Sequence, residues 1–254
     1  MENLTDERKQ ETKALEKEEI QGKEVVEPKL EGVESTKSKL ESTKPKPEST
    51  KPKLDYIVLG SGSSGNAVRI GDIMIDCGLP YPKMKEELKK CKALFITHKH
   101  GDHLRKETFK KIKQHHRRLK IFGNWQVAEV VSVDHITNRK SIKMNNWVLT
   151  PFEVPHDVVT QGVVINFDNG LDVIYVTDSA GNKEWKKGKY DYLFLESNHD
   201  ENIINQVKTS DYKYDVVAGA KRHTSTQESK AFYYLNRKNK DSEWIELHKS
   251  GRFY

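Results

Sequence analysis

The sequence predicts an α/β domain built from layers of helices and sheets. Its first part contains strand-like apolar segments close enough to pair as hairpins, and its later part places helices between further strands. This mixture argues against an all-β sandwich. A length of 254 residues, of which 35% are hydrophobic and 32% charged, suits one domain with a substantial core.

The ordered part is expected to begin near Leu54, with a strand at 54–59 and a second at 67–75 that turns at Gly71-Asp72. Between them lies a glycine-rich segment, Gly-Ser-Gly-Ser-Ser-Gly-Asn at 60–66, which we interpret as a tight turn, with a functional loop as the alternative. It is not a P-loop, because no Gly-Lys-Ser/Thr follows. Further strands are predicted at 93–97, 119–122, 147–154, 162–167, 172–177, 192–196, 215–218 and 244–247, and helices at 82–90, 104–117, 125–132 and 226–236.

Residues 1–53 are predicted to form a disordered charged tail ahead of a folded domain at 54–254. The tail is rich in Glu, Lys, Ser, Thr and Pro and has no aromatic residue, so it cannot bury enough apolar surface to offset its ordering entropy. Glu-Ser-Thr-Lys recurs every seven residues from Glu34, without the apolar positions of a coiled coil. A short charged helix at about 6–20 is compatible with the pattern. We interpret the tail as a tether, with docking to a partner as the alternative.

Composition excludes several classes of protein. Two cysteines, Cys77 and Cys91, cannot form a disulfide framework and fit a reducing compartment. No apolar run approaches the roughly 20 residues of a membrane span, and the first residues lack the apolar stretch of a secretion signal. We therefore expect a cytoplasmic protein without a membrane partner. A homodimer is compatible with this composition.

The net charge of the whole chain is +6, and its positive excess lies entirely on the predicted domain. Of the 44 basic and 38 acidic residues, the tail holds 12 and 13, and the domain 32 and 25. A basic domain attracts polyanions such as nucleic acid, although a generally lysine-rich composition produces the same excess. The predicted helix and turn at 106–120 carry seven Lys or Arg residues, either as phosphate contacts or as a solvated face.

The strongest motif is His98-Lys99-His100-Gly101-Asp102-His103, at the exit of the predicted strand 93–97. Three imidazoles and a carboxylate within six residues are hard to explain structurally, and both groups are ordinary ligands for zinc, manganese and related ions. Gly101 is expected to let the loop curl so that alternate side chains converge.

More distant candidates stand where later strands end. A lone histidine after a strand is more often structural than ligating, but three such residues together with the loop reverse that expectation. A carboxylate is also the natural bridge between two cations. These candidates are His156, Asp178 and His248.

The motif His-x-His-x-Asp-His resembles the signature of the metallo-β-lactamase-fold superfamily, and the resemblance covers essentially all of 54–254. It implies a four-layer αβ/βα sandwich with two divalent metal ions, zinc or manganese. By this resemblance the first metal would be held by His98, His100 and His156. The second would be held by Asp102, His103 and His248, with Asp178 as the bridge. Asp102 also counts among the catalytic residues, and Asp76 would orient a ligand from behind.

Three later segments narrow the resemblance to the RNase Z branch. A strand-end Glu196, a His-Ser/Thr motif at His223 and the final motif His-x-Ser-x-Arg-aromatic at 248–253 recur there in this order. Glu-Ser-Asn-His-Asp at 196–200 and the glycine-rich segment are closer still to small YycJ (WalJ)-type proteins, which are regarded as DNA exonucleases.

The resemblance implies a nuclease or phosphodiesterase. Two cations would polarise the phosphate and lower the pKa of a bridging water, and the hydroxide would attack phosphorus in line. His223, oriented by Glu196, would stabilise the phosphoryl oxygens or protonate the leaving oxygen, with His199 as a competitor. His223 also competes with His248 as the last metal ligand, and we prefer His248 because it ends a strand.

The chain departs from the branch in some respects. Arg222 replaces the glycine that usually precedes the motif histidine, and no segment could host the exosite arm of RNase Z or a β-CASP domain. Transfer-RNA maturation and RNase J-type activity are therefore disfavoured. Alternatives to a DNA exonuclease are a cyclic-nucleotide phosphodiesterase, a thioester or lactone hydrolase, and a non-catalytic metal-containing binding module. The retention of every expected ligand argues against the last of these.

Overall fold

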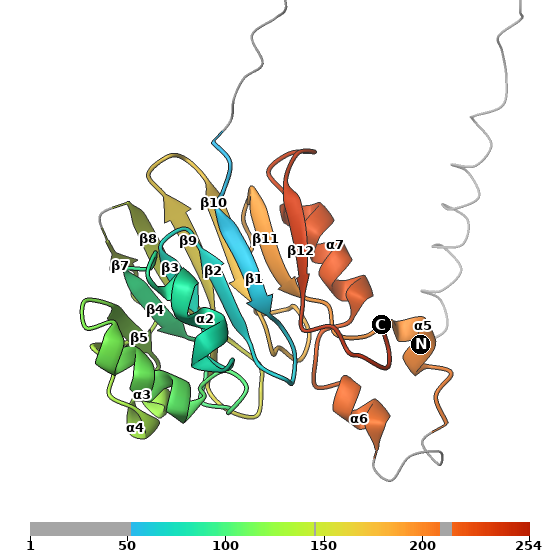
Figure 1. The fold of residues 1–254 in the computed structure, drawn as a ribbon. Helices are drawn as coiled ribbons and strands as arrows, with labels where there is room; N and C mark the ends of the chain where they lie inside the picture. Colours follow the sequence, from blue (N-terminus) through green and yellow to red (C-terminus); the bar gives the residue numbers. More distant parts are fainter. Residues whose placement is uncertain (1–51, 145, 209–214) are drawn as a thin grey trace, which may run out of the picture. The chain divides into compact units, whose positions relative to one another are not determined.

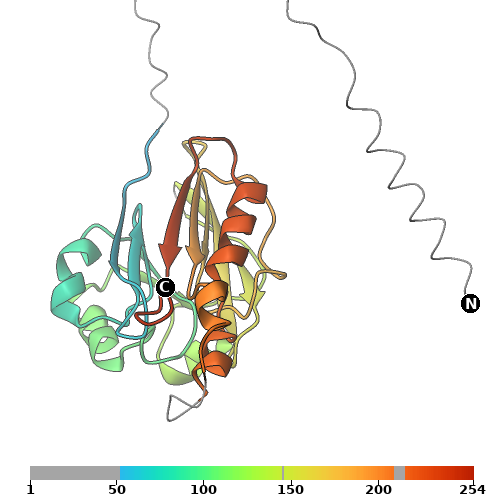
Figure 2. The ribbon, with the colours of Figure 1, turned by 90° about the vertical axis from the view of Figure 1, so that its right-hand side faces the viewer.

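The computed structural model describes residues 52–144, 146–208 and 215–254. These residues form two six-stranded sheets that face each other, with helices on the outer side of each sheet (Figures 1 and 2). This is the predicted αβ/βα sandwich. The tail predicted at 1–53 lies outside the described residues except for its last two, as does the short helix expected near 6–20.

The first sheet has the order β1-β2-β3-β4-β5-β6. Its strands are β1 Tyr56–Gly60, β2 Ala67–Ile70, β3 Ile73–Ile75, β4 Ala93–Ile96, β5 Lys120–Gly123 and β6 His135–Ile136. Its helices are α2 Tyr81–Leu88, α3 Lys106–His115 and α4 Trp125–Val130. Strands β3 to β6 run parallel, whereas β1, β2 and β3 form the predicted hairpins.

The second sheet has the order β12-β11-β10-β9-β8-β7. Its strands are β7 Ile142–Lys143, β8 Trp147–Val154, β9 Thr160–Phe167, β10 Asp172–Val176, β11 Tyr192–Glu196 and β12 Glu243–Leu247. The helices that follow in the chain are α5 Glu201–Ile204, α6 Val216–Ala220 and α7 Thr226–Asn236. Strands β10, β11 and β12 run parallel to one another.

Three apolar layers hold the sandwich together. The central layer lies between the two sheets and includes the fully buried rings of Phe95, Trp147 and Phe194. A second layer packs α2 and α3 on the first sheet, and a third packs α7 on the second sheet through Phe232. Burial of such side chains contributes roughly 1.5–3 kcal/mol each, so these layers supply the main stabilisation of the fold.

Local sequence explains where several helices begin. Pro80 occupies the N-cap position of α2 without a capping hydrogen bond, and Pro82 lies in the first turn, where a missing backbone N–H has no consequence. Helix α7 begins with a capping box, in which Ser225 accepts from the backbone of Glu228 and the Glu228 side chain reaches back. None of the described helices has both the length and the apolar character needed to cross a membrane.

One predicted strand is wrong. Residues 215–218 were expected to be extended because of their two valines, but Val216–Ala220 forms the helix α6. The Asp215 side chain accepts a hydrogen bond from the backbone N–H of Ala218 at 2.8 Å, which caps the helix, and Val216 and Ala220 pack with Phe253. The two-residue strands β6 and β7 and the short helix α5 were not predicted, and the other predicted elements are confirmed within a few residues.

Candidate metal centre

Residues from six separate chain segments converge at one edge of the sandwich. Because β3, β4, β10, β11 and β12 are parallel within their sheets, their carboxyl ends lie at common edges, and the predicted site residues follow these ends. The residues concerned are Asp76 after β3, His98–His103 after β4, His156 after β8, Asp178 after β10, Glu196 at the end of β11 and His248 after β12.

The first group of potential ligands consists of three histidines. One nitrogen of each of His98, His100 and His156 lies within 4.8 Å of the others. His98 Nε2 is 3.1 Å from His100 Nδ1, and the His98 side chain is fully buried, whereas the other two are partly exposed. The structure therefore brings together the three residues expected to hold the first metal.

The second group combines carboxylates and imidazoles, namely Asp102, His103, Asp178 and His248, again within 4.8 Å. Asp178 Oδ2 is 2.7 Å from His103 Nε2, and Asp178 Oδ1 is 3.1 Å from His248 Nε2. Asp178 Oδ2 is also 3.4 Å from His98 Nε2. Asp178 thus lies between the two groups, where the bridging ligand is predicted.

Asp76 contacts His103, a member of the second group, at the ring nitrogen that does not face Asp178. Its Oδ2 is 2.7 Å from Nδ1 of His103, and its carboxylate also accepts from the backbone N–H and the hydroxyl of Thr97. All three residues are completely buried. A carboxylate on the far nitrogen fixes the ring orientation of a metal-binding histidine, and this is the role predicted for Asp76.

Three site residues adopt left-handed backbone conformations. The φ angles of Asp76, Asp178 and His248 are 63°, 50° and 55°. Each residue lies immediately or soon after a parallel strand, so the chain turns sharply there and the side chain points across the sheet edge. Asp and His tolerate this region better than most non-glycine residues, although it still costs free energy.

The loop at 98–103, called the histidine loop, packs directly against the backbone of Gly78. A Cβ at this position would lie 1.6 Å from the carbonyl oxygen of Asp102, which also accepts a hydrogen bond from Asn66 N at 2.7 Å. Gly101, by contrast, has nothing within 4 Å of such a Cβ and no left-handed φ. The loop therefore depends on Gly78, and the expectation that Gly101 is needed for its curl is wrong.

We expect Gly78→Ala to displace the loop that carries Asp102 and His103. Overpacking of this kind costs roughly 1–3 kcal/mol of unfolding free energy, and the displaced ligands should lose affinity for metal. Urea denaturation and metal content by mass spectrometry measure both effects. Gly101→Ala, in the same loop, is the control, and equal behaviour of the two variants would contradict this account.

Glu196 and His223 form a pair beside the second group. His223 Nδ1 is 2.7 Å from Glu196 Oε1, and the Glu196 side chain is fully buried. His248 Nδ1 lies 3.3 Å from the same Glu196 oxygen, and the two imidazole rings stack with centroids 4.9 Å apart. His223 can also be grouped as a ligand with Asp178, Glu196 and His248, so the choice between His223 and His248 stays a prediction.

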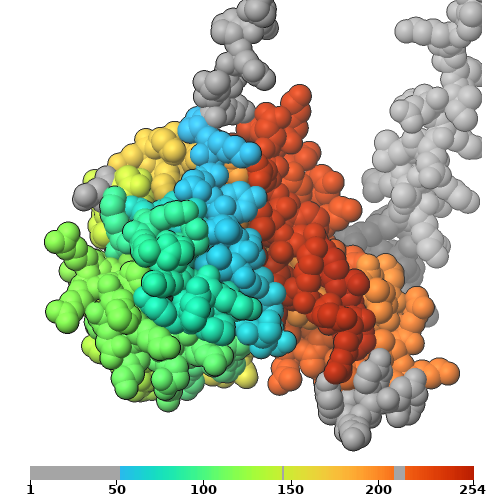
Figure 3. All heavy atoms as spheres, in the orientation of Figure 1, coloured from blue at the N-terminus to red at the C-terminus, as the bar shows by residue number. Residues whose placement is uncertain are grey.

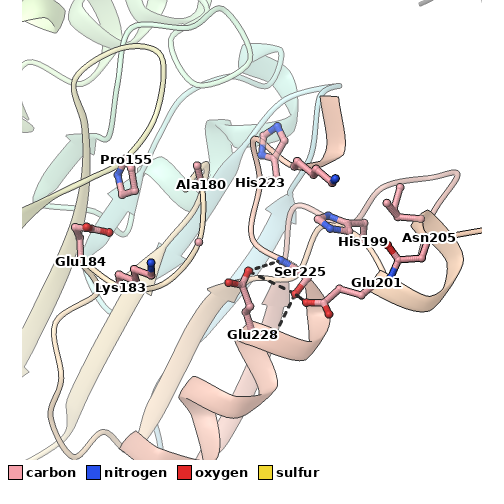
Figure 4. Close-up of a pocket in the computed structure, with 13 residues that line it drawn as sticks. Pro155, Ala180, Lys183, Glu184, His199, Glu201, Asn205, His223, Ser225 and Glu228 are labelled. Carbon is pink, nitrogen blue, oxygen red and sulfur yellow. Dashed lines mark hydrogen bonds between the residues drawn. The ribbon is translucent and has the colours of Figure 1, made fainter. Parts of the chain in front are cut away.

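His199 lies apart from these groups. Its side chain is buried, and its Nδ1 has no hydrogen-bond partner among the described residues. It lines a cavity of about 550 Å³ that also includes His223, Glu201, Ser225 and Glu228 (Figure 4). None of the metal-ligand groups found among the described residues includes His199.

Burial and neighbouring charges shift the pKa values of the potential ligands in different directions. Burial lowers the pKa of His103, but the carboxylates of Asp178 and Asp76 outweigh burial and hold that pKa well above its usual value. Burial and the neighbouring His103 keep the pKa of His98 well below its usual value. Burial raises the pKa of Asp178, but His103 and His248 outweigh it and hold that pKa well below its usual value. Ionised Asp178 and neutral His98 are the forms that bind a cation, whereas a cation at His103 would displace the proton that the two carboxylates favour there.

Unsatisfied atoms indicate what the centre would accept. Asp178 Oδ1 and His248 Nε2 are buried and lie 3.1 Å apart, but neither forms a hydrogen bond, with the other or with any further atom in the described part of the chain. Buried polar atoms without partners are rare, and both atoms are metal ligands by type. The donor set therefore fits two divalent cations, one among the three histidines and one at the mixed group.

Sequence reasoning missed three residues that contact the predicted ligands. Asn66 Nδ2 is 2.8 Å from His103 Nε2, and Asn198 Nδ2 donates to the backbone oxygen of His248 at 2.8 Å. Asp157 Oδ1 is 3.1 Å from Nε2 of His156. Asn66 ends the glycine-rich segment and Asn198 follows Glu196 closely, so their positions were signals, whereas nothing distinguished Asp157 except its place after His156.

Comparison with known proteins supports this description. A model of the beta-lactamase superfamily domain matches residues 73–234. No curated protein sequence matches the chain significantly. The metallo-beta-lactamase fold protein YhfI from Bacillus subtilis is similar in structure, with a TM-score of 0.59 and 18% identity over 78% of this chain and 86% of that one.

Two further solved structures share the fold. A diphosphatase from the PhnP family has a TM-score of 0.57 and 17% identity over 79% of this chain and 88% of its own. The short form of human tRNase Z has a TM-score of 0.53 and 18% identity over 78% of this chain and 93% of its own. At these identities the likeness shows the metallo-β-lactamase fold.

Proposed function

The chain belongs to the beta-lactamase superfamily, and on this premise we propose that it is a metal-dependent hydrolase of phosphodiester bonds, a nuclease that acts on DNA. Two divalent cations, zinc or manganese, would be held by the ligands already described. His98, His100 and His156 would bind one, and Asp102, His103 and His248 the other, with Asp178 between them.

The observation that carries this proposal is the Glu196–His223 pair, with its Nδ1–Oε1 distance of 2.7 Å. Glu196 occupies Nδ1 of the ring, so Nε2 is the atom that can face a substrate and hold a proton for it. A leaving alkoxide needs that proton, whereas a thiolate, with a pKa of about 8.5, leaves without one. An acid beside the metal centre therefore favours phosphodiesters over thioesters.

The names of two similar structures support the same substrate class. One is a diphosphatase and the other a tRNase, and both names refer to bonds of phosphoric acid. The cations, when bound, would supply an activated water and neutralise charge on the phosphoryl oxygens. Glu196 would hold the His223 ring in position, and Asp76 would hold that of His103.

A substrate panel tests the proposal. The purified chain is incubated with zinc or manganese and with labelled duplex DNA, single-stranded DNA, RNA, 3′,5′-cyclic nucleotides, a thioester and a lactone. Degradation of DNA is expected. Cleavage of cyclic nucleotides while DNA and RNA remain intact would refute the nuclease assignment, and hydrolysis of thioesters or lactones alone would refute the phosphodiester assignment.

Removal of metal should affect both activity and stability. A chelator should reduce hydrolysis to background, and added zinc or manganese should restore it. A cation at one hundred times its dissociation constant stabilises the folded state by about 2.7 kcal/mol, which corresponds to a fall in Tm of roughly 5–10 °C on chelation. Calorimetry with and without chelator measures this shift, and an unchanged Tm would argue against a structural contribution of the metals.

A further inference from the structure

Two cavities meet at the His223 side chain. The first, of about 550 Å³, is called the carboxylate cavity here and contains Glu184, Glu201 and Glu228. The second, of about 710 Å³, is called the basic cavity and contains Arg222, Lys249 and Arg252. His223 lines both. Each cavity is in the size range of sites for small molecules. If the phosphorus atom of a phosphodiester lies near His223, each of its two substituents therefore has a cavity to occupy.

The charges of the two cavities differ. Three Lys or Arg side chains and no carboxylate line the basic cavity, and one of them, Lys249, also pairs with Glu246 Oε2 at 2.8 Å. It lies where the C-terminal segment adjoins the glycine-rich segment 60–66, shown red beside blue in Figure 3. The carboxylate cavity has three glutamates against two lysines, Lys183 and Lys221. A polyanionic strand is therefore attracted to the first cavity and opposed in the second.

The carboxylate cavity also contains hydrogen-bonded polar side chains. Ser225 Oγ donates to Glu201 Oε1 at 2.5 Å, and the Ser225 backbone N–H donates to Glu228 Oε2 at 3.3 Å (Figure 4). His199, only 5% exposed, lines the same cavity with its Nδ1 unpartnered among the described residues. Carboxylates accept hydrogen bonds from hydroxyl and amino groups, so the site suits the sugar and base of a nucleoside.

Resting on the proposed function, we propose that the carboxylate cavity receives the terminal nucleoside of a strand and that the rest of the strand crosses the basic cavity. A terminal hydroxyl fits this cavity, because Glu201 and Glu228 can accept from it. A terminal phosphate would place a second negative charge against these carboxylates. An internal nucleotide carries such a phosphate on its far side, so this cavity would account for the exonuclease action that the sequence resemblance implies.

Strand ends of defined chemistry test the proposal. One oligonucleotide is prepared with a hydroxyl or a phosphate at the 5′ end, with a hydroxyl or a phosphate at the 3′ end, and as a closed circle. Phosphate at one of the two ends should lower kcat/KM about tenfold, and the circle should resist cleavage. Cleavage of the circle at the linear rate, or indifference to both end phosphates, would overturn the proposal.

Variants of each cavity give opposite results. The double change Glu201→Gln with Glu228→Gln removes two charges but keeps the size of the side chains and a capping residue for α7. It should abolish the discrimination against a terminal phosphate. Arg222→Ala should lower kcat/KM for oligonucleotides roughly fivefold and reduce the slope of log KM against log salt concentration by about 1. Persistent discrimination in the first variant and an unchanged slope in the second would each contradict the assignment.

Two controls separate this proposal from the function on which it rests. Lys240→Ala removes an exposed cation from the loop before β12, at the end of that strand far from His248. It should change neither the discrimination against a terminal phosphate nor the salt dependence of KM. Bis(4-nitrophenyl) phosphate reports diester hydrolysis without a strand. Absence of hydrolysis of both this diester and DNA by the native metal-loaded chain would refute the proposed function, whereas hydrolysis together with indifference to strand ends would refute the cavity assignment alone.

Discussion

An Asp178→Ala variant is expected to lose hydrolysis of every substrate. Asp178 lies 2.7 Å from His103 and 3.1 Å from His248, and it is the carboxylate placed between the two ligand groups. Its removal would leave each cation with one ligand fewer and with less charge compensation. A loss of about 4 kcal/mol of transition-state stabilisation corresponds to roughly a thousandfold lower kcat/KM.

The measurement combines kinetics with metal analysis. Asp178→Asn, which keeps the shape of the buried side chain, should lose activity to a similar extent, so misfolding would not account for the result. Asp168→Ala removes an exposed carboxylate from the loop between β9 and β10, at the opposite edge of the sheet, and serves as the control. If the Asp178 variants bind two metals and retain activity within tenfold of native, the bridging role is wrong.

His223→Ala is expected to lower kcat strongly while metal content stays near normal. Its Nδ1 is bonded to Glu196, and its ring faces the two cavities, so its loss removes the acid for the leaving group but no preferred ligand. General acid catalysis contributes about a hundredfold to ten-thousandfold. A substrate with a 4-nitrophenolate leaving group, which needs no proton, should lose much less, and comparison of the two substrates isolates the protonation step.

Matched variants decide between His223 and His248. His248→Ala should lose one metal equivalent, whereas His223→Ala should keep two. The reverse pattern would show that the two histidines exchange roles. Glu196→Gln should reproduce part of the His223→Ala effect, because the carboxylate acts through the ring that it holds.

Much of the fold was predictable because strands and their ends follow simple rules. Apolar runs such as 93–97 and 172–177 identify buried parallel strands, and polar residues directly after them fall at one edge of a sheet. Strand ends located His98, Asp178 and His248, and the metallo-β-lactamase resemblance implied that they share one centre. Because β4 lies in one sheet and β10 and β12 in the other, strand direction by itself does not bring His98 beside the other two.

Other parts depend on tertiary contacts that local patterns do not contain. Residues 215–218 have β-branched side chains, yet the cap by Asp215 and the packing of Val216 on Phe253 select a helix. The two-residue strands β6 and β7 are too short to produce a periodic pattern. The close approach of Gly78 to Asp102 links segments on either side of α2, and only the folded chain reveals it.

The left-handed backbone at Asp76, Asp178 and His248 means that folding stability and catalytic function favour different residues at these positions. Glycine would occupy these positions without steric strain, but it has no group that can bind a cation or orient a ligand. Each site residue therefore sacrifices some folding free energy, on the order of 1 kcal/mol, to present its side chain at the sheet edge. Selection for stability alone would remove these residues first, and selection for catalysis would keep them.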